Sequence, residues 1–535
     1  MLTDVAGNEG DEARKGQTSR RAFMGLAAAG VASVAAGCTG VTASQPQPKA
    51  VRATRSWRPP VAENSLPGDP NWAISNLGGE HAIEGYTGKT SVLTGESFPL
   101  FVSTESTGFS VTAFRLGWYQ GTGARKVWTS KTLRGGQQRS ASVLPPTNTV
   151  QTDWDPVIEV PTHDWPAGGY LLRLDADSGA QRYVPVTVRS ASCAGAIVLK
   201  SCVQTWQAYN LWGGYDLYKD AAGVYANRSL VVSLDRPYDI NGADYFLTYE
   251  RNIIKLAEHM IAGQGLNLAY VSSMDIAADP HLLDGASALV SMGHDEYWTP
   301  EERANVTAAR NSGVNLAFMG ANACFRRTRL QSSPLGSARQ VVCYKTDYTQ
   351  DPEYGKDPAE VTSDWREPPL SDPESSLIGT IYEGYPADAP YVVSSPGSWV
   401  FKGTGVSEGA SFPHLVGIEY DRVNPAYPLQ RPIEVLSHSP LTCLGASSYG
   451  DSAYYTHSGG AGVFNAGTLR WVEAIYGDQP HGITGSTPAF VMRATMNVLR
   501  AFADGPAAAK YPAHDNLDEI HEYVGDPIGN PQNLQ

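Results

Sequence analysis

Hydrophobic and polar positions follow two different patterns along the chain, one before residue 190 and one after it. Between residues 72 and 190, apolar residues alternate with polar ones in short runs that end at Gly, Pro or Asp. A period of two is typical of strands with one buried face. The pattern predicts strands at 98–103, 110–118, 169–175 and 183–188, and therefore a β-sandwich.

After residue 190, short apolar runs alternate with stretches of helical spacing. The expected elements are a helix at 249–261, a strand at 266–271, a strand at 286–291, a helix at 299–311, a strand at 314–320 and a helix at 488–502. Thr299 is expected as the N-cap of the helix at 299–311, with Pro300 in its first turn and Glu302 closing a capping box. Strands that alternate with helices predict a mostly parallel sheet covered on both faces.

These patterns divide the chain into an immunoglobulin-like β-sandwich at 72–190 and an α/β domain at 191–505. The length of 535 residues exceeds what one hydrophobic core usually organises, which agrees with a multidomain protein. Residues 39–71 are rich in Pro, Ser, Ala and Gln without periodicity and predict a flexible linker. Residues 506–535 predict a polar tail.

The amino-terminal segment 1–38 has the features of an export signal. Arg20 and Arg21 precede a weakly apolar run that ends at Cys38, which is typical of a twin-arginine signal with a lipoprotein cleavage box. The run is shorter than the roughly 20 residues that span a bilayer, so we expect it to be removed and Cys38 to carry the lipid. A plain signal peptidase site is the alternative. The mature chain is expected outside the cytoplasm, anchored on the outer face of the cytoplasmic membrane.

Charge and cysteine spacing exclude several classes of protein. A formal net charge of −14 disfavours nucleic acid and anionic membrane surfaces, so a small neutral partner is expected, with the membrane reached only through the lipid anchor. The cysteines after Cys38 show no paired CxxC spacing. Neither a zinc ribbon nor a disulfide scaffold is therefore indicated.

The most informative polar segment follows the predicted strand at 286–291, where His294 and Glu296 flank an aspartate. In α/β enzymes, loops at the carboxyl ends of parallel strands carry the functional groups. Asn322 follows the next predicted strand and is expected at the same edge of the sheet. These side chains could move protons or bind a metal. Helix capping by the acidic residues and a turn at Asn322 are the structural alternatives.

Several motifs, taken together, carry a family resemblance. They lie at 115–125, 206–214, 234–238, 294–298 and 315–322. In this order, and over roughly residues 85–500, they resemble the large (β) subunit family of N,N-dimethylformamidase. The resemblance implies a sandwich followed by an α/β domain similar to class I glutamine amidotransferases. It also implies a mononuclear ferric, Fe(III), site held by two tyrosines and one glutamate.

The resemblance assigns residues of this chain to that site. The expected metal ligands are Glu296, Tyr170 and Tyr209, with Tyr215 and Tyr218 as rivals for the second tyrosine position. The expected catalytic residues are His294, Asn322, Lys345 and Glu419. A tyrosine in a strand is more often a packed side chain, so a structural role is the alternative for each tyrosine.

This residue set suits a ferric ion. A hard cation prefers anionic oxygen, and two phenolates with one carboxylate neutralise its charge. The ion would polarise an amide carbonyl or activate water, while His294 moves a proton and Asn322 donates a hydrogen bond to the developing oxyanion. The expected function is hydrolysis of the carbon–nitrogen bond of a small linear amide. A homo-oligomer or a small subunit stays open as a further partner.

Three other functions compete with amide hydrolysis at iron. Gly405–Gly409 has the spacing of a nucleophile elbow around Ser407, but the residues after it break a helix. Cys202 lacks the flanking glycines that an amidotransferase-like nucleophile needs. A non-catalytic envelope lipoprotein could bind a glycan or small ligand through aromatic residues such as Trp118 and Trp206, and would need no iron.

Asp235 and Arg236 stand side by side in one of the family motifs. We expect a structural ion pair here and no catalytic role, because an arginine in a packed motif commonly fixes a loop.

Overall fold

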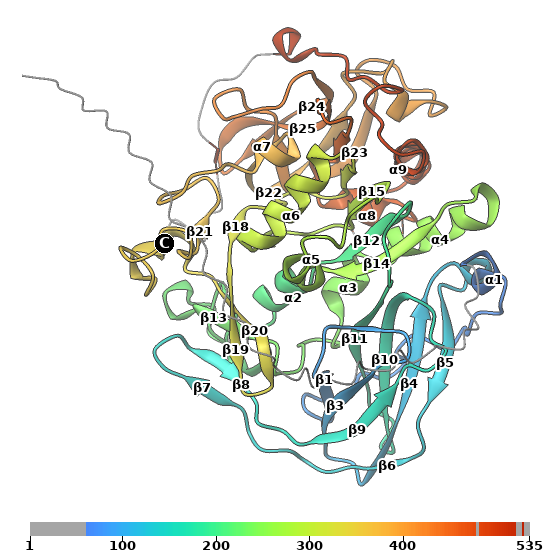
Figure 1. Cartoon of the computed structure of the whole chain (residues 1–535), viewed down its shortest axis with the longest axis vertical. Helices are drawn as coiled ribbons and strands as arrows, with labels where there is room; N and C mark the ends of the chain where they lie inside the picture. The colour runs from blue at the N-terminus through green and yellow to red at the C-terminus, as the bar shows by residue number, and fades with distance from the viewer. Residues whose placement is uncertain (1–59, 478–480, 521–526, 529–535) are drawn as a thin grey trace, which may run out of the picture. The chain divides into compact units, whose positions relative to one another are not determined.

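The computed structural model of the chain describes residues 60–477, 481–520 and 527–528 (Figure 1). The expected signal, with Arg20, Arg21 and Cys38, and most of the expected linker lie outside these residues. The protein is rich in β-structure, with several sheets and few helices. Over the described ranges, no helix is both long and apolar enough to cross a membrane.

The first part of the described chain forms two sheets around one apolar core. The smaller sheet has the order β1 (Ile83–Thr87), β3 (Ser97–Thr104), β9 (Pro156–Pro161). The larger has the order β2 (Ser91–Leu93), β11 (Gln181–Arg189), β10 (Gly168–Ala176), β4 (Gly108–Leu116), β5 (Ala124–Thr129), with β6 (Leu133–Arg134) also pairing with β4. A hairpin joins β7 (Ser142–Leu144) to β8 (Thr149–Gln151). The four strands predicted here are confirmed as β3, β4, β10 and β11.

A seven-stranded sheet organises the second part of the chain (Figure 1). Its order is β14 (Leu268–Ser272), β12 (Ile197–Ser201), β15 (Ala288–Ser291), β17 (Asn315–Phe318), β26 (Gly462–Asn465), β25 (Ala446–Thr456), β24 (Ile433–Cys443). The first five strands run parallel, and β25 and β24 are antiparallel. The strands predicted at 266–271, 286–291 and 314–320 are therefore confirmed as neighbours or near neighbours in one mostly parallel sheet.

Helices cover both faces of this sheet. The helices of the described chain are α1 (Pro60–Asn64), α2 (Val203–Ala208), α3 (Asp244–Tyr249), α4 (Arg251–Gln264), α5 (Ser273–Ala278), α6 (Pro300–Asn311), α7 (Ser375–Ile378), α8 (Arg470–Ala474) and α9 (Thr487–Ala503). Leu199 and Val290 share a core with α4 and α9, whereas their neighbours Val198 and Leu289 share another with α5 and α6. Successive side chains of a strand point to opposite faces, so a strand buried on both sides is mostly apolar.

The predicted helix signals are confirmed with one difference. Thr299 accepts a hydrogen bond from the backbone N–H of Glu302 at 3.1 Å, and Pro300 lies in the first turn of α6. The Glu302 carboxylate instead accepts bonds from Lys200 at 2.7 Å and Gln204 at 2.9 Å. The expected capping box therefore gives way to a buried ion pair, because a lysine buried in the sheet needs a carboxylate.

Three smaller sheets in the second part of the described chain were not predicted by the periodicity. They are β13 (Val231–Ser233), β20 (Gly336–Val342), β19 (Arg329–Ser333); β16 (Tyr297–Trp298), β18 (Arg326–Arg327), β21 (Ser363–Asp364); and β22 (Ile381–Val392), β23 (Ser411–Arg422). They explain why residues 191–505 contain more β-structure than a simple alternation of strands and helices.

Both predicted flanking segments are partly packed. Glu63 of α1 is buried and accepts bonds from Tyr119 at 2.8 Å and Arg125 at 2.7 Å, so the end of the predicted linker is fixed. Asn516 accepts a bond from the backbone of Val435 at 2.8 Å, so the first part of the predicted tail lies against β24. In each case one buried polar side chain with long-range partners holds the segment in place, although flexibility had been predicted for the linker.

Candidate active site

The candidate site lies where β15 and β17 end. The loop after β15 carries His294 and Glu296, and the loop after β17 carries Asn322. A Cβ atom added to Gly320 would lie 2.4 Å from the carbonyl oxygen of Gly293, so only glycine permits this approach of the two loops. The adjacent parallel strands thus bring together side chains that are distant in sequence.

Three acidic oxygen groups meet in the centre of the site. Tyr209 ends α2, and Tyr218 follows nine residues later. The Oη atom of Tyr209 lies 2.6 Å from Glu296 Oε2, and that of Tyr218 lies 2.7 Å from Glu296 Oε1. The two Oη atoms are 2.9 Å apart, and the two rings stack at a centroid distance of 4.6 Å. Burial, followed by the nearby Glu296 carboxylate, raises the pKa of both phenols well above the ordinary value.

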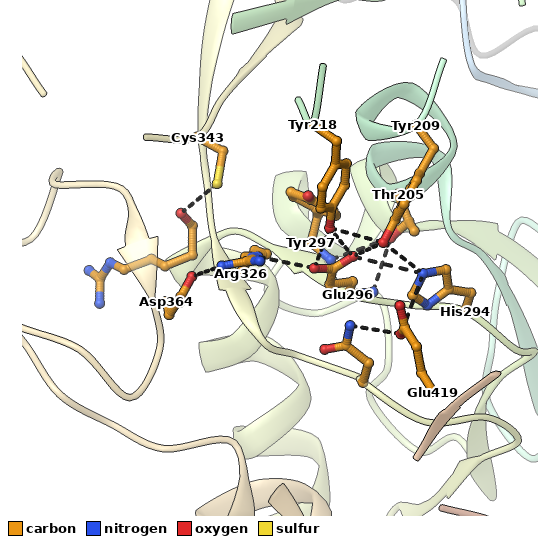
Figure 2. A network of polar contacts seen from close by, with 12 residues as sticks. Thr205, Tyr209, Tyr218, His294, Glu296, Tyr297, Arg326, Cys343, Asp364 and Glu419 are labelled. Carbon is orange, nitrogen blue, oxygen red and sulfur yellow. Dashed lines mark hydrogen bonds and ion pairs between the residues drawn. The ribbon is translucent and has the colours of Figure 1, made fainter. Parts of the chain in front are cut away.

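Charged and polar groups hold Glu296 from two opposite sides (Figure 2). Arg326 of β18 lies 3.0 Å from Glu296 Oε1 and also pairs with Asp364 of β21. The backbone N–H of Glu296 donates to Thr205 Oγ1 at 3.1 Å. Burial opposes ionisation of Glu296, but the charge of Arg326 outweighs it, so the pKa of this carboxyl lies below its ordinary value. Glu296 is therefore ionised and held in a fixed position.

His294 and Glu419 lie close to each other beside Tyr209 and Glu296. His294 Nε2 lies 3.1 Å from Tyr209 Oη, 3.8 Å from Glu296 and 3.9 Å from Glu419. Burial lowers the pKa of His294, which favours the neutral imidazole. Asn322 Nδ2 donates to Glu419 at 2.9 Å. Burial, then repulsion from Glu296, raises the pKa of Glu419 to about 8, so its carboxyl holds a proton at neutral pH.

Lys345 lies on the other side of Tyr218. Its Nζ atom is 3.1 Å from the centroid of the Tyr218 ring and has no hydrogen-bond partner within the described part of the chain. Burial, followed by Arg326, lowers the pKa of Lys345 well below its ordinary value. The structure thus brings together six of the residues expected at the site, namely Tyr209, His294, Glu296, Asn322, Lys345 and Glu419.

Tyr170 is not part of this group, which corrects the expected ligand set. It lies in the core of the sandwich, where its Oη donates to the Pro166 carbonyl at 2.6 Å and its ring stacks on Trp165 at 5.0 Å. The structural alternative therefore holds for Tyr170. Of the two rivals, Tyr218 contacts Glu296, whereas Tyr215 packs with the aromatic cluster around Trp212.

Three functional neighbours were not identified from the sequence. Arg326 contacts Glu296, and Tyr245 and Tyr249 of α3 pack on His294 at centroid distances of 6.2 and 5.5 Å. Arg326 follows a segment with no periodicity, and Tyr245 and Tyr249 fit the spacing of an ordinary amphipathic helix. The single available signal was the clustering of six tyrosines at 209–218 and 238–249 in a small part of the chain.

The competing nucleophiles lie in unsuitable places. Ser407 is exposed in an irregular segment with no helix directly after it. Cys202 is buried, and burial raises the pKa of its thiol well above the ordinary value. The thiolate is the reactive form, so a raised pKa opposes nucleophilic catalysis by Cys202.

The aromatic residues and the Asp235–Arg236 pair also have structural partners. Trp206 is only 6 % exposed and its Nε1 donates to Glu250 at 2.9 Å, so it offers no open face for a sugar. Trp118 stacks on His259 at 3.9 Å. Asp235 pairs with Arg339 at 2.7 Å, whereas Arg236 bonds to backbone carbonyls. The expected ion pair between Asp235 and Arg236 is therefore wrong, although both residues are structural.

The donor set fits a small, hard cation. Bonds of about 2.0–2.1 Å at right angles separate neighbouring ligand oxygens by roughly 2.9 Å, close to the 2.6–2.9 Å among Tyr209, Tyr218 and Glu296. Buried phenols with raised pKa values ionise when a cation replaces their protons. No group of three or more His, Cys, Asp or Glu side chains suited to a metal occurs in the described ranges, so a metal here would depend on the tyrosines.

Comparison with known proteins gives one strong match. None of the curated proteins matches the chain. One similar solved structure is a cycloisomaltooligosaccharide glucanotransferase of Paenibacillus sp. complexed with cycloisomaltoheptaose, with 11% identity, 44% of each chain covered and a TM-score of 0.15. This chain thus spans less than half of that enzyme, and a similarity of this size carries no argument. The family described as N,N-dimethylformamidase beta subunit-like, C-terminal, matches residues 110–482, which is more than half of the chain. The chain belongs to the N,N-dimethylformamidase beta subunit-like family.

Proposed function

We propose that this protein hydrolyses the carbon–nitrogen bond of a small linear amide at a mononuclear ferric ion held by Tyr209, Tyr218 and Glu296. The observation that carries the proposal is the meeting of three acidic oxygens within 2.6–2.9 Å of one another in a buried site. Family membership supports an amidohydrolase. A bound ferric ion supplies Lewis acidity for the amide carbonyl or for water.

The residues around the three oxygens can carry the proton steps. His294 is neutral, lies beside Tyr209, and can take a proton from the attacking water and deliver it to the leaving nitrogen. Glu419, with a pKa of about 8, holds a proton 3.9 Å from His294 and can relay the transfer: it gives its own proton to the leaving nitrogen and takes the one that His294 removed from water. Asn322 is oriented by Glu419 and offers its amide N–H to developing negative charge on oxygen.

The surroundings favour an uncharged substrate. Tyr209 stacks on Tyr245 at 5.0 Å, and Tyr245 and Tyr249 both pack on His294, so aromatic rings enclose the groups that would react. Burying an unpaired charge among such rings is costly, whereas a small neutral amide loses little hydration. The resemblance to N,N-dimethylformamidase makes formamides the first substrates to test.

The wider setting of the enzyme is part of the same proposal. We propose export by the twin-arginine route and a lipid anchor at Cys38, with a homo-oligomer or a small subunit as partner. The sandwich is proposed to be immunoglobulin-like and the parallel sheet to resemble class I glutamine amidotransferases. The motifs of the sequence and the order of the sheets support these assignments.

The test is iron content together with turnover of the purified full chain. Iron close to one per chain, a visible phenolate-to-ferric charge-transfer band and release of amine from small amides would support the proposal. Glu296→Gln should lose iron and activity. Glu419→Gln, a similar change in the same pocket at a residue that is not a proposed ligand, should keep iron and lose turnover. Colourless wild-type protein that takes up no ferric ion would refute the iron site.

A further inference from the structure

A buried arginine holds the segment that joins the two site tyrosines. This segment runs from Asn210 to Leu217, and it turns back so that Tyr218 reaches Tyr209. Arg236 is fully buried, and its Nη1 atom donates to the carbonyls of Trp212 and Tyr215, both at 2.9 Å. Its Nη2 atom donates to the carbonyl of Asn210 at 2.8 Å. One guanidinium thus binds three carbonyls of the eight-residue segment.

This arrangement is energetically unusual. A buried guanidinium normally lies against a carboxylate, because an unpaired buried charge is costly. Within the described chain the hydrogen bonds of Arg236 all go to carbonyl oxygens, and the neighbouring Asp235 is bonded to Arg339 and Ser333 instead. Burial lowers the pKa of Arg236 to about 10, opposed by Asp216. The guanidinium of Arg236 therefore fixes the path of the segment by binding its carbonyl groups, and it forms no ion pair among the described residues.

The planar, forked shape of the guanidinium accounts for the choice of residue. The guanidinium carries several N–H groups in a fixed plane. These groups donate at the same time to the carbonyls of Asn210, Trp212 and Tyr215. A lysine ammonium is a compact point charge on a flexible stem and cannot reproduce this geometry. Losing the fork would leave buried carbonyls without donors.

Other contacts of the segment transmit this constraint to Tyr218. Gly213 and Gly214 adopt φ values of 77° and 90°, the left-handed region that the turn requires. Asp216 then accepts bonds from the backbone N–H groups of Tyr218 at 2.7 Å and Lys219 at 2.8 Å. The backbone of Tyr218 is thus fixed three residues after Tyr215, whose carbonyl is the last that Arg236 binds.

We infer that Arg236 is a positioning residue for the tyrosine pair, holding the 210–217 segment so that both phenols meet at Glu296. The inference rests on the proposed function for its consequence in iron binding. The placement of Tyr218 by the segment does not depend on iron and can be tested on the metal-free chain.

The test compares two buried arginines of similar exposure. Arg236→Lys removes the fork, whereas Arg339→Lys changes an arginine whose hydrogen bonds within the described chain go to Asp235, Thr87 and Leu234, outside the segment. Amide hydrogen exchange of peptides covering 210–218 is measured on metal-free full chain. Dissociation of iron into a chelator and the charge-transfer band are then measured on loaded protein. Arg236→Gln, which leaves no buried charge, serves as a second variant.

The expected result is faster exchange over 210–218 and a shifted charge-transfer band in both Arg236 variants, with neither change in Arg339→Lys. Iron should dissociate about 10- to 100-fold faster, the usual consequence of losing an outer-shell support. Unchanged exchange over 210–218, or equal changes in Arg339→Lys, would overturn the inference. So would failure of both Arg236 variants to fold when Arg339→Lys folds, because Arg236 would then be a general structural residue.

The same experiment separates this inference from the proposed function. A wild-type chain without a ferric band would refute the proposed iron site, and the exchange comparison on metal-free protein would still decide whether Arg236 positions the segment.

Discussion

Removing single hydroxyl groups tests whether Tyr218, as we propose, or Tyr170, as the resemblance first implied, is the second tyrosine ligand. Tyr218→Phe removes an oxygen that lies 2.7 and 2.8 Å from the two Glu296 oxygens and 2.9 Å from Tyr209 Oη. Tyr170→Phe removes an oxygen that bonds to the Pro166 carbonyl at 2.6 Å. Both changes delete one buried hydroxyl and keep the ring, so they form a matched pair.

The two variants should lose similar amounts of stability. Tyr170→Phe leaves one buried carbonyl without its donor, which costs about 1–3 kcal/mol. Tyr218→Phe removes a bond to a carboxylate, about 1.5–3 kcal/mol, but Glu296 keeps Tyr209 and Arg326 as partners, so the lower end is expected. Urea unfolding of metal-free protein should therefore give comparable losses, read as midpoint shifts at constant m value.

Iron binding should differ sharply between them. Tyr218→Phe loses one of three proposed ligands, so iron content should fall and the charge-transfer band should change in energy and intensity. Tyr170→Phe should match wild type in both. Retention of iron and band by Tyr218→Phe, together with their loss in Tyr170→Phe, would refute the assignment made from the structure.

Three further predictions follow from the packing and the pKa values. Gly293→Ala places a Cβ atom 2.5 Å from the carbonyl oxygen of Tyr249, so the loop that carries His294 must shift. Turnover should fall, and the free energy of unfolding should drop by about 1–3 kcal/mol. Gly79→Ala, whose added Cβ meets nothing within 4 Å, should change neither turnover nor stability. Burial raises the pKa of Glu250 from 4.5 to about 8, so the folded state binds its proton more tightly than the unfolded state. The free energy of unfolding should then fall between pH 4.5 and 8 by up to about 1.4 kcal/mol per pH unit for this group, and Glu250→Gln should flatten that slope in urea titrations. Cys202→Ala should keep amide hydrolysis, and loss of activity in a folded, iron-loaded variant would contradict the exclusion of a cysteine nucleophile.

The local signals of the sequence located the main elements. Period-two runs identified β3, β4, β10 and β11, and Thr299 and Pro300 identified the start of α6, because strand alternation and helix capping depend on neighbouring residues. The order of strand, helix and strand also placed His294, Glu296 and Asn322 at one sheet edge, since parallel strands end on the same side.

Contacts between distant segments were beyond the reach of these signals. Tyr170 and Tyr218 were both candidate ligands from the resemblance, and only the packed chain shows that one hydroxyl lies in the sandwich and the other at Glu296. Arg326 reaches Glu296 across two short strands that have no period of their own.

The sequence by itself therefore determined the two kinds of secondary structure, the strand-to-helix loop with its His294 and Glu296, and the family of the chain. The tertiary structure decided which tyrosines complete the site and which arginines support it. The physical reason is that periodicity, caps and motifs report interactions over a few residues, whereas the oxygens of Tyr209, Tyr218 and Glu296 meet only after segments far apart in sequence have been packed into one core.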